Sequence, residues 1–235
     1  MPIQESSPRN LLTSLILVFP LFLIYQVGVL FTLPMLNGAD FVTVLLFNSF
    51  GLTIKGYLLF LAAVVALFAL ALAMLGRKQH FNARVFLPVL LESTVYALTM
   101  GSLIVLLMTK VLGISPNLAA GLPAQGLLAR LVMSLGAGVY EETVFRLGLL
   151  GGLIVAFEKL ARMNRWAAVL GALVLSSAVF SGVHYIPPYG DAFGLGSFTF
   201  RVLAGIVFGV LCRARGFAVA VYTHAFYDIF VLAIR

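Results

Sequence analysis

The chain has 235 residues, of which 62% are hydrophobic and only 10% are charged. A soluble domain carries about 25% charged residues, so this composition excludes a water-soluble fold and predicts an all-α integral membrane protein. The net charge of +7 comes from short basic clusters between apolar runs, a distribution that is typical of membrane topology rather than of nucleic-acid binding.

The apolar runs predict the transmembrane helices. A helix needs about 20 apolar residues to cross the hydrocarbon core of a bilayer. On this criterion we expect about seven spans, with an eighth left open, at 11–33, 54–76, 87–110, 129–157, 166–184, 199–213 and 216–234. The apolar stretch 40–50 is too short to cross, and we expect it to lie at the interface. Neither a repeat nor a linker divides the chain, so residues 1–235 are expected to form a single transmembrane domain.

The basic residues predict the orientation of these spans. With seven spans, Arg9 and the three most basic loops fall on the same side of the membrane. Lysine and arginine are enriched in cytoplasmic loops. We therefore expect a cytoplasmic N-terminus and a location in the plasma membrane.

The fourth predicted span contains three charged residues, Glu141, Glu142 and Arg146. Each charge at the centre of a membrane helix costs roughly 2.5–3.5 kcal/mol on the insertion scale, so these residues are expected to pair or to face a polar site. Glu142 and Arg146 are four residues apart and lie on one helix face, where they can form an ion pair. Glu141 lies about 100° around the helix and needs another partner.

Polar residues in two later spans can complete a site. His184 ends the fifth span one helical turn after Phe180, and His224 lies one turn before Asp228 on the last span. Two imidazoles and two carboxylates on three helices could supply a general base, a proton carrier and oxyanion donors, or they could bind zinc. Structural alternatives stay open for each signal: a buried ion pair, a histidine–aspartate contact between helices, and a phenylalanine that only packs.

Glycines recur in the fourth and sixth predicted spans. They are Gly136, Gly138, Gly148, Gly151, Gly152, Gly205 and Gly209. Glycine lets two helix backbones approach closely. These positions are expected to mark contacts between helices, either within the chain or between copies of it, and the oligomeric state stays open.

Together, these residues resemble the three ordered motifs of the CPBP family, which includes the CAAX prenyl-protein endopeptidase and the bacteriocin-processing (Abi) proteins. The motifs are Glu141-Glu142-x-x-x-Arg146, Phe180-x-x-x-His184 and His224-x-x-x-Asp228. The resemblance covers about residues 130–230, where it implies the catalytic core. It implies an intramembrane endopeptidase that cuts a membrane-associated or lipidated peptide.

The resemblance also implies a role for each residue. Glu141 and His184 would activate the hydrolytic water, while His224 and Asp228 would bind the developing oxyanion or orient the substrate. Glu142 and Arg146 would hold their helix in place. An ionised Asp228 cannot donate a hydrogen bond to an oxyanion, so it would act either protonated or by orienting His224.

The resemblance favours a reaction without a metal. The better-understood members of the family look like glutamic proteases, and the sequence has no HExxH motif, so we expect no cofactor. A zinc protease with Glu141, His184 and His224 as ligands is the alternative. A bacteriocin-immunity or scaffold protein of the same fold, and a transporter with a proton relay, also stay open. The expected partners are membrane lipids and a peptide or lipidated-protein substrate, and no nucleic acid.

Overall fold

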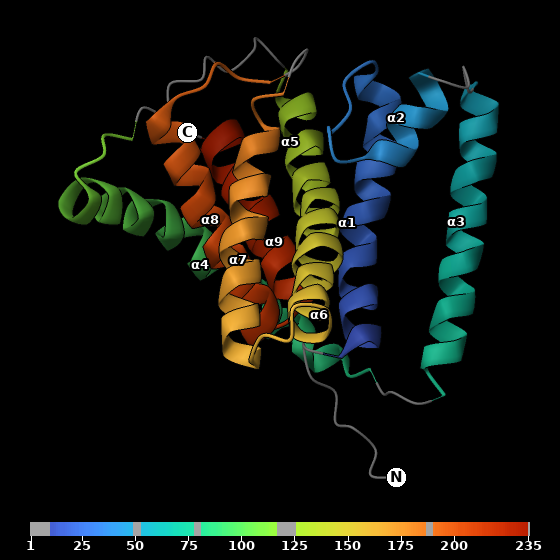
Figure 1. The fold of residues 1–235 in the computed structure, drawn as a ribbon. Coiled ribbons are helices and arrows are strands. Elements are labelled where there is room, and N and C mark those ends of the chain that lie inside the picture. Colours follow the sequence, from blue (N-terminus) through green and yellow to red (C-terminus); the bar gives the residue numbers. More distant parts are fainter. Residues whose placement is uncertain (1–9, 49–52, 78–80, 117–125, 187–189, 235) are drawn as a thin grey trace.

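The computed structural model of the chain describes residues 10–48, 53–77, 81–116, 126–186 and 190–234. Every regular element within these ranges is a helix, which confirms the all-α fold (Figure 1). In chain order the elements are α1 (Leu11–Thr32), α2 (Phe41–Asn48), α3 (Ile54–Leu75), η1 (Ala83–Val85), α4 (Phe86–Leu107), η2 (Met108–Leu112), α5 (Leu127–Gly136), η3 (Ala137–Glu141), η4 (Thr143–Leu150), α6 (Gly151–Lys159), α7 (Arg165–Val183), α8 (Leu195–Ala214), α9 (Phe217–Asp228) and η5 (Ile229–Ile234).

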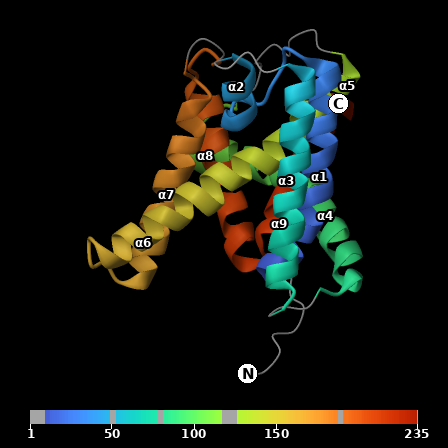
Figure 2. The same ribbon diagram turned by 90° about the vertical axis from the view of Figure 1, so that its right-hand side faces the viewer.

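Each of the seven predicted spans corresponds to a helical segment. Five are long and apolar enough to cross a membrane by themselves: α1, α3, the segment Ala83–Leu112 around α4, α7 and α8. The span predicted at 129–157 is a continuous rod from α5 to α6 with π-helical turns in its middle, and it crosses the bundle obliquely (Figure 2). The last span is the shorter apolar helix Phe217–Leu232. The chain is therefore an integral membrane protein, and the stretch 40–50 contains the short helix α2.

Polar caps and one glycine determine where several helices begin. The side chains of Asn10, Thr53 and Asn164 accept hydrogen bonds from the backbone amides of Thr13, Gly56 and Ala167 at the starts of α1, α3 and α7. These bonds satisfy amides that have no partner inside the helix. Gly216 separates α8 from α9 with a φ of 113°, a conformation that residues with a Cβ rarely adopt. The chain can therefore reverse there, and α9 packs against α8.

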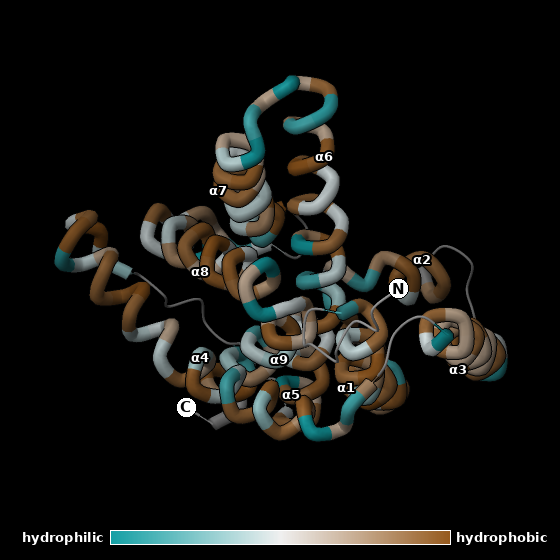
Figure 3. Tube along the Cα trace, turned by 90° about the horizontal axis from the view of Figure 1, so that it is seen from below, coloured by the Kyte–Doolittle hydropathy of each residue, from teal (hydrophilic) through white to brown (hydrophobic). Residues whose placement is uncertain are grey.

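Helix α9 lies at the centre of the bundle and carries part of the expected site. All its residues from Ala218 to Ala225 are buried, and α9 packs against α1, α4, α5 and α8 (Figure 3). By contrast, α3 lies at the edge of the bundle (Figure 1), and its most apolar stretch has no buried residue. It contacts α1 through stacked rings of Phe19 and Phe68 and a 3.1 Å hydrogen bond from the Tyr57 hydroxyl to the Gln26 carbonyl.

Because successive helices run in alternate directions, the helix ends that flank the basic connections lie at one end of the bundle. Helices α3, α6 and α8 end, and α4, α7 and α9 begin, at the end of the bundle where α1 begins (Figure 1). Helices α1 and α7 end at the opposite end. This arrangement agrees with the grouping of the basic loops that underlies the predicted orientation.

Only some of the glycines allow close helix approach. A Cβ at Gly138 would lie 2.7 Å from the Val221 carbonyl oxygen on α9, and one at Gly209 would collide with Leu173 on α7. Gly136 and Gly205 likewise face side chains of other helices. Within the described part of the chain, Gly148, Gly151 and Gly152 mark no contact with another helix. Gly148 and Gly151 meet only backbone of their own rod, and Gly152 meets nothing within 4 Å.

Candidate active site

The predicted ion pair between Glu142 and Arg146 forms in the middle of the α5–α6 rod. Arg146 Nε lies 3.0 Å from Glu142 Oε2, and both side chains are almost completely buried. The guanidinium carbon lies 4.5 Å from the ring centroid of Phe180 and 5.3 Å from that of Phe208. Aromatic faces attract cations, so these two rings help to hold the charge of Arg146 inside the bundle.

His224 lies between three carboxylates. Its Nδ1 atom is 2.8 Å from Glu142 Oε1, while its Nε2 atom is 3.9 Å from Glu141 Oε2 and 3.7 Å from Asp228 Oδ2. The ring stacks on Phe208 with a centroid distance of 4.4 Å. Gly138 makes this meeting possible, since it brings the rod against the turn of α9 that carries His224.

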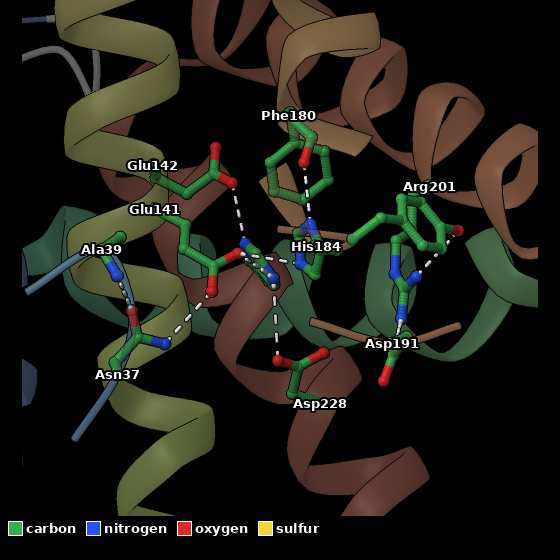
Figure 4. A network of polar contacts seen from close by, with 11 residues as sticks. Asn37, Ala39, Glu141, Glu142, Phe180, His184, Asp191, Arg201 and Asp228 are labelled. Carbon is green, nitrogen blue, oxygen red and sulfur yellow. Dashed lines mark hydrogen bonds and ion pairs between the residues drawn. The ribbon is translucent and has the colours of Figure 1, made fainter. Parts of the chain in front are cut away.

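His184 reaches the same point from the end of α7. It follows the last residue of that helix, and its Nδ1 atom lies 2.8 Å from the carbonyl oxygen of Phe180. The last carbonyls of a helix lack amide partners. The imidazole of His184 therefore supplies the hydrogen-bond donor for the Phe180 carbonyl. The Nε2 atom then lies 3.9 Å from Glu141 Oε2 (Figure 4).

The partners of the two Nδ1 atoms determine the tautomers of the histidines. A carbonyl oxygen can only accept a hydrogen bond, so Nδ1 of His184 carries a hydrogen. The Glu142 carboxylate, paired with Arg146, accepts from Nδ1 of His224 in the same way. When neutral, each imidazole therefore presents the lone pair of Nε2 toward Glu141. When protonated, it presents an N–H group there.

The sequence analysis missed Asn37, which also contacts Glu141. Asn37 lies in the connection between α1 and α2, and its Nδ2 atom donates a hydrogen bond of 3.1 Å to Glu141 Oε1 (Figure 4). The only signal in the sequence is the Asn37-Gly38 dipeptide, which is typical of turns. It does not indicate a partner more than 100 residues away.

Asp40 ends the same connection and caps α2. Its Oδ1 atom accepts a 3.1 Å hydrogen bond from the Thr43 amide, and the residue is completely buried. Burial raises the pKa of the Asp40 carboxyl, while its hydrogen bonds with Thr43 act in the opposite direction. A buried acid thus lies close to, but outside, the group of residues around Glu141.

Arg201 on α8 anchors the chain that follows His184. Its Nη2 atom forms an ion pair with Asp191, and its Nη1 atom donates a 3.0 Å hydrogen bond to the Tyr185 hydroxyl. The Asp191 amide in turn donates to the His184 carbonyl at 2.8 Å. These contacts, also missed from the sequence, tie the end of α7 to α8 (Figure 4).

The structure brings together all the residues that the sequence analysis singled out. The arrangement joins a carboxylate and two imidazoles on three helices, with supporting contacts from Glu142, Arg146, Phe180 and Asp228. The donor types would suit zinc. Within the described ranges, however, no three His, Cys, Asp or Glu side chains are arranged to hold a metal ion.

Comparison with known protein families gives a match in the second half of the chain. Residues 123–230 match the family described as type II CAAX prenyl endopeptidase, Rce1-like. No curated protein and no solved structure matches the chain. The matched range contains Glu141, His184 and His224, whereas Asn37 and the helices α1 to α4 lie outside it.

Proposed function

Because residues 123–230 belong to the Rce1-like family of type II CAAX prenyl endopeptidases, we propose that the protein is an intramembrane endopeptidase with Glu141 as its general base. One observation carries the proposal: Glu141 Oε2 lies 3.9 Å from the Nε2 atoms of both His184 and His224. These separations are too long for direct hydrogen bonds. They are suited to a water molecule that bridges the carboxylate and an imidazole.

In this proposal, Glu141 and His184 activate the water. The neutral His184 accepts one hydrogen bond from the water through Nε2, and Glu141 removes a proton as the water oxygen attacks the carbonyl carbon of the substrate. Glu141 then passes this proton to the nitrogen of the leaving peptide as the C–N bond breaks. The side chain of His184 is 27% exposed against 6% for His224, so substrate approaches from the His184 side.

His224 supplies charge to the transition state. Three carboxylates, those of Glu141, Glu142 and Asp228, surround its ring. When protonated, its Nε2–H group can donate to the oxyanion that forms on the substrate. Asp228 orients and balances this imidazolium. That role avoids the difficulty that an ionised aspartate cannot donate a hydrogen bond.

No step of this mechanism requires a metal, and we propose a glutamic protease without a cofactor. The substrate is a membrane-associated or lipidated peptide, because the site lies inside a bundle of apolar helices and can receive a chain only from the membrane or its surface.

We also place the basic connections at 77–84, 159–165 and 213–215 in the cytoplasm. Leu160→Cys and Ile186→Cys, made in a Cys212→Ser background, test this orientation by labelling with an impermeant thiol reagent from each side of the membrane.

The experiment that tests the function is cleavage of lipidated and leader-type peptides by the purified protein in liposomes. Glu141→Gln keeps the size of the side chain but cannot act as a base, so we expect cleavage to disappear while the unfolding temperature stays nearly unchanged. Cleavage that persists in Glu141→Gln would contradict the assignment. Each assay is repeated with a strong zinc chelator. Activity that is lost with the chelator and restored by zinc would move the same residues into a metal site.

A further inference from the structure

We propose that Asn37, which lies outside the matched range 123–230, is a positioning residue for Glu141. Its Nδ2 atom lies 3.1 Å from Glu141 Oε1, and the asparagine is 9% exposed. This inference rests on the proposed function in naming Glu141 as the base. The contact itself can be tested without any assay of cleavage.

The orientation of the Asn37 amide follows from its other partners. Its Oδ1 atom accepts a 2.8 Å hydrogen bond from the Ala39 amide, which only an oxygen can do. The nitrogen must therefore face Glu141. As a result, Asn37 donates to the carboxylate and cannot accept a proton from it.

The backbone of Asn37 is also held on both sides. Its carbonyl accepts a 3.0 Å hydrogen bond from the Asp40 amide, which closes a tight turn, and its own amide donates to the Tyr25 hydroxyl at 3.1 Å. Tyr25 is completely buried, and its ring packs against Tyr140, which precedes Glu141. The Tyr25 ring fits against the rod because residue 136 is a glycine: a Cβ at Gly136 would collide with that ring. The amide is thus fixed relative to the rod that carries Glu141.

This contact determines which oxygen of Glu141 is free to react. Asn37 occupies Oε1, while Oε2 faces the two histidines at 3.9 Å. Without Asn37 the carboxylate could rotate, and Oε2 would no longer be held toward the water position. Since a misplacement of about 1 Å can cost about 100-fold in rate, we expect the loss to affect kcat rather than substrate binding.

Asn37→Ser separates positioning from folding. The serine hydroxyl can still accept the Ala39 amide and so keeps the turn, but it is too short to reach Glu141 and adds no charge. We expect kcat to fall by about 10- to 100-fold with KM within about twofold of the wild type and a nearly unchanged unfolding temperature. Asn164→Ser is the matched control. It makes the same chemical change at an exposed cap that accepts the Ala167 amide at 3.0 Å, and it should leave kcat unchanged.

The contact is measured directly by the reaction of Glu141 with a hydrophobic carbodiimide, which modifies protonated carboxyl groups and is followed by mass spectrometry. The Asn37 amide covers Oε1 of Glu141, so Asn37→Ser and Asn37→Ala should speed the labelling of Glu141 at one fixed pH. The titratable groups that contact Glu141, His184 from α7 and His224 from α9, are the same in all variants.

The two readouts distinguish the possible failures. Wild-type kcat together with wild-type labelling in a folded Asn37→Ser protein would overturn the inference. If Glu141→Gln still cleaves, the proposed function fails, and the labelling still decides whether Asn37 holds Glu141. A fall in kcat that merely follows a loss of folded protein, with unchanged labelling, would also refute a positioning role.

Discussion

The Nδ1 atom of His224 lies 2.8 Å from Oε1 of Glu142, the carboxylate that also pairs with Arg146. The ion pair is therefore more than a support for its own helix. It orients an imidazole that comes from α9, and through the opposite nitrogen of that ring it is connected to Glu141. The two neighbouring glutamates approach the two nitrogens of one histidine.

This connection predicts that Glu142 and Arg146 act on stability together. Glu142→Gln leaves Arg146 buried without a partner for its charge, and Arg146→Met leaves the buried Glu142 carboxylate with His224 but without its cation. Removing one partner of a buried pair costs about 3–5 kcal/mol, so each variant should unfold well below the wild type in detergent. The double variant should lose less stability than the sum of the losses in the two single variants. Strictly additive losses would mean that the two charges do not interact.

Gly138 provides a test of helix packing at the site. Gly138→Ala would place a methyl group 2.7 Å from the Val221 carbonyl oxygen, and backbone cannot yield as a side chain can. We expect a loss of about 1–3 kcal/mol and a lower kcat, because α9 and His224 move away from Glu141. Gly152→Ala, in the same rod with open space around it, should be neutral or slightly stabilising. Thermal unfolding and peptide cleavage by both variants provide the comparison.

Arg201 is expected to influence activity more than stability. Its ion pair with Asp191 is partly exposed, so Arg201→Met should cost only about 0–1 kcal/mol. The same change removes the ion-pair partner of Asp191, whose amide donates to the His184 carbonyl, and kcat can fall by up to about 100-fold. Arg213→Met, at an exposed position of the same helix, is the control. Equal kcat values in the two variants would show that the anchor does not matter.

Asp40 predicts a pH dependence of stability. Burial raises the pKa of this carboxyl, so its contribution to stability is complete below the unfolded pKa and is lost as the pH rises through the folded pKa. Asp40→Asn still caps α2 but carries no charge. It should therefore raise the unfolding temperature at pH 7.5, and the difference from the wild type should shrink toward pH 4. Asp40→Ala also loses the cap, so it should be about 1 kcal/mol less stable than Asp40→Asn at both values.

The sequence predicted those features that depend on local spacing. Apolar runs of about 20 residues identified the spans, and the four-residue spacings placed Glu142 with Arg146 and His224 with Asp228. The contact between Glu142 and His224 did not follow from spacing, because it depends on how the rod packs against α9. The same reason explains why Gly138 and Gly152 look alike in the sequence but differ in the structure.

Two of the residues that were missed lie outside the helices. Asn37 and Asp191 are polar residues in segments that connect helices, where polar residues are common. Their importance comes from their partners, Glu141 and Arg201, which only the assembled bundle brings near. Helical periodicity carries no information about such contacts, since it describes one element at a time.

The position of Asn37 has a consequence for how relatives of this protein are recognised. The matched range 123–230 contains the charged core of the site, but it does not contain the amide that contacts Glu141. Two proteins with the same three motifs can thus differ in the segment that lies against Glu141. Sorting such proteins requires aligning the turn Asn37-Gly38-Ala39-Asp40 as well as the motifs, because the candidate site is assembled from two stretches of chain.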